Sequence, residues 1–157
     1  MSSFRLAGID HEPFEPLFSL DDARLRERGA VRCVATGQPG FPCRVSLEDA
    51  KVGEELLLLP FVHQPGASPY RASGPIFVRR GAKRQILPAR VVPPHIARRL
   101  MSVRAYDAAH MMIDATVTES ADVASSLDRF FANADTAYVH LHNTGRGCFS
   151  CTAERVG

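Results

Sequence analysis

The chain has 157 residues, of which 45% are hydrophobic and 23% are charged, the composition of an ordinary globular domain. Its longest apolar run covers only residues 56–62, against the roughly 18 residues of a membrane helix. Residues 1–10 lack the basic and apolar pattern of a secretory signal. We therefore expect one domain over residues 1–157, located in the cytoplasm, and neither a membrane protein nor a disulfide-stapled one.

The net charge is only +2, but the charges are segregated along the chain. Residues 56–106 contain nine basic and no acidic side chains, whereas the remainder contains ten basic and 17 acidic ones. The favoured interpretation is that the basic segment pairs with acids from both ends, and the alternative is a positive face for an anion. We do not expect nucleic-acid binding, because no aromatic RNA-binding signature accompanies the charge.

The N-terminal part alternates short strands with one helix. The pattern predicts strands at 4–9 and 31–35, with a helix at 20–28 between them. Ser19 is the predicted N-cap of this helix and Gly29 its end.

A turn cluster at 37–42 separates this part from the most apolar strand, 55–62. Between them, Ser46 and Asp49 have the spacing of a capping box and predict one helical turn. The strand is continuously apolar, which indicates burial on both faces. Pro60 should place a bulge or a sheet edge near its end.

Residues 75–118 predict a short strand at 75–78, a short helix at 94–98 with Pro94 at its first position, and a hairpin of strands 100–106 and 111–118. In the second hairpin strand, polar and apolar residues alternate in part, which predicts one wet face and one dry face.

The strongest helix signal covers residues 119–133, where the apolar stripe of a core-facing helix recurs at Val123, Leu127, Phe130 and Phe131. A second hairpin follows, with strands 137–142 and 148–156 joined by the loop 143–147. Since turns join most of the strands, we expect an α+β fold with a mainly antiparallel sheet and three or four helices.

The four cysteines are expected to be free thiols in a reducing compartment: Cys33, Cys43, Cys148 and Cys151. The CxxC spacing of the last two is that of a redox or zinc motif, but too few residues follow for a supporting helix, and no second CxxC is present. We therefore expect no metal and no cofactor.

His140 and His142 are two residues apart, so in a strand both imidazoles face the same side and could reach one metal ion. Cys148, His63 or His110 could complete such a set, but no spacing selects a third ligand. An exposed histidine pair without metal is the favoured interpretation.

Residues 68–79 combine groups that are typical of binding loops. Tyr70 offers a ring and a hydroxyl, Arg71 and Arg79 offer permanently charged forks, Ser73 offers a small donor, and Gly74 permits close backbone approach. The alternative is a structural turn in which Tyr70 is buried and Arg71 pairs with a carboxylate.

Nucleophilic catalysis is a second hypothesis. Cys43, Cys148, Ser68 or Ser73 could act as nucleophile with a histidine base, either His63 or His142, which gives a hydrolase or transferase based on a Cys–His pair if they meet in the fold.

Three motif segments, 39–59, 68–79 and 140–148, the last with Asn143 and Gly147-Cys148, together resemble a bacterial family of single-domain proteins catalogued only as a domain of unknown function. The resemblance implies a stand-alone bacterial, cytoplasmic protein and carries no catalytic assignment. Cys151 is not part of the pattern.

The leading hypothesis is a small binding or accessory protein that holds a small anionic ligand with the loop 70–79, aided by Arg146. Its rivals are the Cys–His enzyme and a protein-interaction module without a small-molecule site. The sequence decides neither the activity nor the oligomeric state. The candidate ligand-binding residues are His63, Tyr70, Arg71, Ser73, Arg79, Asn143, Arg146 and Cys148.

Overall fold

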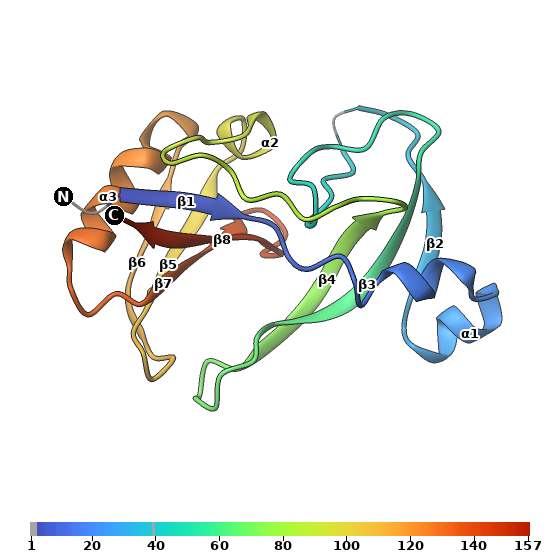
Figure 1. Ribbon diagram of the computed structural model, residues 1–157, viewed down its shortest axis with the longest axis horizontal. Helices are drawn as coiled ribbons and strands as arrows, with labels where there is room; N and C mark the ends of the chain where they lie inside the picture. Colours follow the sequence, from blue (N-terminus) through green and yellow to red (C-terminus); the bar gives the residue numbers. More distant parts are fainter. Residues whose placement is uncertain (1–2, 39) are drawn as a thin grey trace.

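Two antiparallel sheets form the computed structural model, which describes residues 3–38 and 40–157 (Figure 1). Met1 and Ser2 lie outside the described residues, and so does Pro39, which belongs to the predicted turn cluster. The larger sheet has, in spatial order, β1 (Ser3–Ala7), β8 (Phe149–Val156), β7 (Tyr138–Asn143), β5 (Met101–Tyr106) and β6 (Met112–Thr118). The smaller sheet has the order β2 (Val31–Val34), β3 (Glu55–Gln64) and β4 (Ala72–Arg79). The predicted α+β class and both predicted hairpins are thus confirmed.

The helix α3 (Val123–Ala132) covers one face of the larger sheet, after a short 3-10 helix, η2 (Ser120–Asp122). Its predicted stripe is confirmed, since all four residues are at most 2% exposed and belong to one core cluster with β1, β5, β7 and β8. The short helix α2 (Pro94–Ala97) begins at Pro94, as predicted. No helix in the described part of the chain has both the length and the apolar character needed to cross a membrane.

The first helix, α1 (Asp22–Glu27), starts later than predicted, and Ser19 is not its cap. Ser19 instead ends a 3-10 helix, η1 (Glu15–Ser19). Asp21 caps α1 by accepting a hydrogen bond of 2.8 Å from the backbone N–H of Arg24. Gly29 follows α1 with a φ of 73°, which confirms the predicted helix end.

Two other local predictions are wrong. The capping-box segment forms no helical turn, because Leu47 has a φ of 57° and the carboxylate of Asp49 pairs with arginines instead of capping. Strand β6 has no dry face, since it is a sheet edge, with Val117 58% and Ile113 38% exposed.

Most of the basic segment pairs with acids from elsewhere in the chain, as the favoured interpretation of the charge pattern predicts. Seven of its nine cations lie within 4.0 Å of a carboxylate oxygen, in the pairs Arg79–Glu54, Arg80–Glu55, Lys83–Glu15, Arg84–Glu154, Arg90–Asp128, Arg98–Asp49 and Arg99–Asp49.

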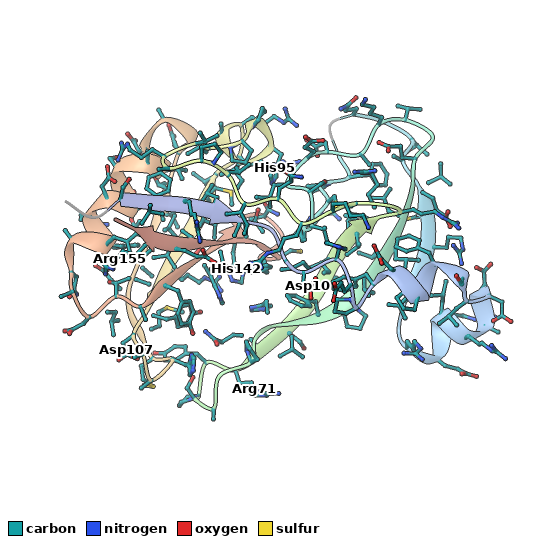
Figure 2. The ribbon with its side chains drawn as sticks, in the orientation of Figure 1. Asp10, Arg71, His95, Asp107, His142 and Arg155 are labelled. Atoms are coloured by element: carbon teal, nitrogen blue, oxygen red, sulfur yellow. The ribbon has the colours of Figure 1, made fainter. Side chains whose placement is uncertain are left out.

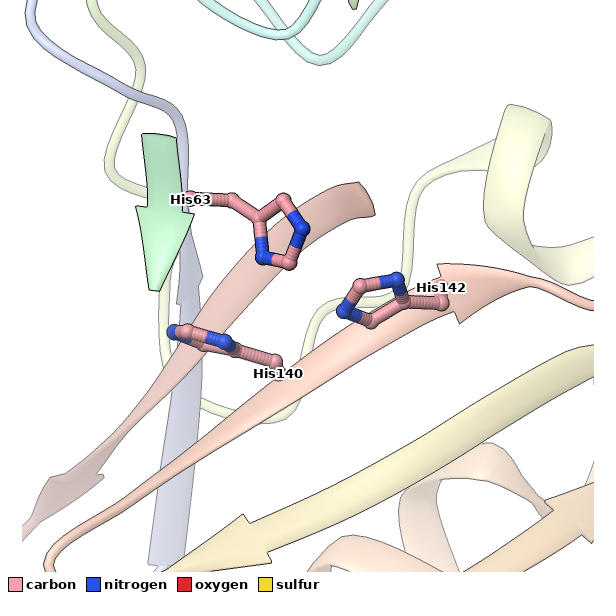
Figure 3. Close-up of side chains that lie close together, drawn as sticks. All are labelled: His63, His140 and His142. Carbon is pink, nitrogen blue, oxygen red and sulfur yellow. The ribbon is translucent and has the colours of Figure 1, made fainter. Parts of the chain in front are cut away.

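The face of the larger sheet opposite α3 is polar. Strand β5 aligns Arg104 with His140 of β7 and Ser102 with His142. Because side chains alternate along a strand, these residues share the face that the apolar Val139 and Leu141 do not occupy. Strand β3 of the smaller sheet brings His63 to this polar face (Figure 3).

Candidate functional site

A cleft of about 630 Å³ lies where the smaller sheet meets the β7–β8 loop, a volume within the range of small-molecule sites. One part of its lining is apolar, from Leu58, Pro75, Ile76, Phe77 and Leu100. The other part is polar and carries three cations, from Arg44, Arg99, Asn143, Thr144, Arg146 and Cys148. Such a lining suits an anion that also has an apolar portion.

Arg44 is the most unusual group in this lining, because it is a cation only 3% exposed. Its Nε donates to the carbonyl of Phe149 at 2.8 Å and its Nη1 to the carbonyl of Pro42 at 2.6 Å. None of the ion pairs among the described residues includes Arg44. Burial lowers the pKa of its guanidinium, and the nearby cation Arg99 lowers it further. A buried charge without a counter-charge is costly, so Arg44 favours an anion in the cleft.

Arg99 and its neighbours form the adjoining wall. The buried carboxylate of Asp49 lies 3.5 Å from Arg99 and also pairs with Arg98. His95 packs nearby with both ring nitrogens buried and without a hydrogen-bond partner among the described residues. Burial lowers the pKa of His95 to about 4, with Arg99, Arg44 and Arg98 acting in the same direction and Asp49 against them.

His95 should make the protein sensitive to mild acid. Unfolding restores the pKa of His95 to about 6.5. Between pH 6.5 and about 4, the unfolded chain therefore binds a proton at His95 and the folded chain does not. The stabilising effect of neutral His95 is complete above pH 6.5 and is lost as the pH falls toward about 4, at on the order of 1 kcal/mol per pH unit. Urea melts of wild type and His95→Met at pH 7, 6 and 5 test this. The variant should lose stability less steeply, and equal slopes would refute the assignment.

A second group of polar side chains lies on the polar face of the larger sheet, where three imidazoles converge (Figure 3). One ring nitrogen from each of His63, His140 and His142 lies within 4.8 Å of those of the other two. The ring of His63 stacks on Phe149 at 5.5 Å, and its centroid is 4.9 Å from that of His142. Burial lowers the pKa of His140 to about 3 and that of His142 to about 4, so both rings are neutral. Burial also lowers the pKa of His63.

Two irregularities in the strand ladders lie beside this group. Strand β3 has one more residue than β4 between the pairs Phe61–Gly74 and Gln64–Ala72, a bulge that accommodates His63. Strand β8 has an extra residue, Ser150, beside His142. Bulges redirect side chains and are common next to functional sites. The bulge of β3 confirms the prediction, made from Pro60, of a bulge or a sheet edge near the end of this strand.

The predicted site residues fall into separate places. Asn143, Arg146 and Cys148 line the cleft, and His63 belongs to the histidine group. The four loop candidates, Tyr70, Arg71, Ser73 and Arg79, do not line the cleft.

The loop residues have other partners. Arg79 pairs with Glu54 at 3.4 Å, and Arg71 donates to the carbonyl of Pro65 at the tip of the β3–β4 hairpin (Figure 2). Tyr70 is 38% exposed, with its ring 6.2 Å from that of Tyr106. Gly74 has open space where a Cβ would be, so no close backbone approach requires it.

All four cysteines are free thiols. Cys151 belongs to the main core, and burial raises its pKa to about 12, while Cys148 lines the cleft. No cysteine–histidine hydrogen bond occurs among residues 3–38 and 40–157. Thiol titration of the denatured protein should find four reactive groups, and two would indicate a disulfide.

Arg44 is not among the site residues predicted from the sequence. A signal was present, since Arg44 is the only charged residue in the run 41–47. A lone cation inside an otherwise uncharged run is a candidate for burial, and buried charges require a specific reason.

Comparisons with known proteins add a family but no activity. No curated protein and no solved structure matches this chain. A family model described as "Protein of unknown function (DUF1203)" matches residues 40–155, which include the whole cleft and all three histidines of the group. The chain therefore belongs to this family of proteins of unknown function.

Proposed function

We propose that the protein binds a small organic anion, such as a carboxylate or a phosphate ester with an apolar portion, in the cleft beside Arg44. The observation that carries this proposal is the burial of Arg44 without a carboxylate partner in the lining of a 630 Å³ cleft. The Nη2 atom of Arg44 has no hydrogen-bond partner among the described residues, so it has donors left for a ligand.

Other groups in the lining complete the anion site. Arg146 is exposed and pairs with no described carboxylate, so it is available to meet an anion at the entrance. Asn143 contributes an amide, and Thr144 has a buried hydroxyl without a hydrogen-bond partner. The apolar side of the cleft, with Leu58 and Ile76, would receive the rest of the ligand.

Thermal melts in phosphate and in citrate, against chloride at equal ionic strength, test this function. An anion at ten times its Kd should stabilise the protein by about 1.4 kcal/mol, which is a rise in Tm of roughly 3–6 °C. The rise should vanish in Arg146→Ala and persist in Arg24→Ala, which removes an exposed arginine of α1.

Arg71→Ala distinguishes the cleft from the loop 70–79. If the cleft is the site, this variant keeps the rise in Tm. A rise that is lost in Arg71→Ala and kept in Arg146→Ala would place the anion at the loop instead, and no rise with either anion would contradict the proposed function.

We further propose that this is a bacterial protein of the cytoplasm. The four free thiols support a reducing compartment.

A further inference from the structure

The imidazoles of His63, His140 and His142 lie on two strands that are distant in the sequence, yet they converge on one point (Figure 3). Each presents a buried nitrogen without a hydrogen-bond partner among the described residues, namely Nδ1 of His63, Nδ1 of His140 and Nε2 of His142. Buried polar atoms normally have partners. Three unpartnered nitrogens in one group therefore indicate one partner that all three share.

The proton of His142 lies on the nitrogen that faces away from the group, as metal binding requires. Nδ1 of His142 lies 3.0 Å from the carbonyl oxygen of Gly147. Since a carbonyl only accepts, Nδ1 carries the proton and Nε2 keeps a free lone pair. In metal sites, a ligating histidine usually donates the N–H of its other ring nitrogen to a carboxylate, a backbone carbonyl or a water molecule.

We propose that His63, His140 and His142 bind a divalent transition-metal ion, with Zn²⁺ as the reference. Tetrahedral zinc with bonds of about 2.05 Å places its nitrogen ligands roughly 3.4 Å apart, so the three nitrogens must close by up to about 1.4 Å. Rotation of the ring of His63 can supply much of this closure, because its strand is bulged there and its side chain is only partly buried.

The donor set selects the class of ion. Three neutral imidazoles suit Zn²⁺, Ni²⁺, Co²⁺ or Cu²⁺, whereas Mg²⁺ and Ca²⁺ require oxygen ligands. Three protein ligands leave a fourth position open. Arg104 faces His140 across the β5–β7 ladder and pairs with no described carboxylate, so the fourth ligand should be an anion. This proposal replaces the expectation from sequence that the protein holds no metal, and it is independent of the anion cleft.

Titration of the metal-free protein with Zn²⁺ tests the site. At 100 times the Kd of Zn²⁺, Tm should rise by roughly 5–10 °C, whereas Mg²⁺ should leave it unchanged. Elemental analysis after desalting should find one zinc per chain. His63→Phe keeps the stacking on Phe149 while it removes both nitrogens, and it should abolish the shift.

Two controls separate this site from other zinc ligands. His11→Ala removes a histidine that is not part of the group and accepts a hydrogen bond from the backbone N–H of Arg84. Cys148→Ser removes the partly exposed thiol of the CxxC segment. Both variants should keep the full shift in Tm. Co²⁺ gives a second readout, because four-coordinate Co²⁺ absorbs strongly in the visible and should lose this absorption in His63→Phe. No shift in wild type, a shift retained by His63→Phe, or a shift lost in Cys148→Ser would each overturn the proposal.

Discussion

Replacing Phe130 by alanine is expected to lower the free energy of unfolding by about 3–5 kcal/mol. The side chain of Phe130 is 2% exposed and packs in the core between α3 and the larger sheet. Its removal loses apolar burial and leaves a cavity that the surrounding strands cannot fill. Urea melts of both proteins measure the difference.

A matched control lies on the same helix. Ser125 is exposed on α3, and Ser125→Ala should change stability by no more than about 0.5 kcal/mol. A loss below about 1 kcal/mol in Phe130→Ala would mean that α3 does not pack on the sheet as described.

The second large effect is expected at Gly8, where alanine should cost about 3 kcal/mol through overpacking. A Cβ there would overlap the carbonyl oxygen of Val45 and lie 3.1 Å from that of Arg44. Both obstacles are backbone atoms, and hydrogen bonds hold them in place, from Gln85 to Val45 at 3.0 Å and from Ile9 to Arg44 at 3.1 Å. Relief of the overlap must therefore move the segment that carries Arg44.

Gly74→Ala is the control for this prediction, because a Cβ at Gly74 has no neighbour within 4 Å and its φ is not positive. It should be nearly neutral in the same denaturant melts. Equal stability of the Gly8→Ala and Gly74→Ala variants would show that the chain does not approach Gly8 closely.

Local patterns in the sequence predicted local structure well. The stripe of α3, the helix start at Pro94 and the stop at Gly29 each depend on a few neighbouring residues, and all three are confirmed. Prediction failed where a partner that is distant in the sequence determines the local structure. Asp49 pairs with Arg98 and Arg99 across the fold instead of capping a helical turn, and no spacing within 46–49 contains that information.

The same limit applies to the candidate sites. The i, i+2 spacing places His140 and His142 on one face. His63 joins them through a bulge, which Pro60 indicated in the sequence, and through contact between two sheets, which no sequence pattern shows. The loop 68–79 has the composition of a binding loop, yet its arginines find partners in Glu54 and in the carbonyl of Pro65. Composition identifies groups that can bind an anion, whereas only the fold shows which of them lacks a partner.

The most direct test of the anion site is a crystal soaked in selenate, whose selenium is located by its anomalous scattering. We expect a peak in the cleft within hydrogen-bond reach of the guanidinium groups of Arg44 and Arg146 in wild type, and no such peak in Arg146→Ala. An empty cleft, or a peak only beside Arg71 and Arg79, would contradict it.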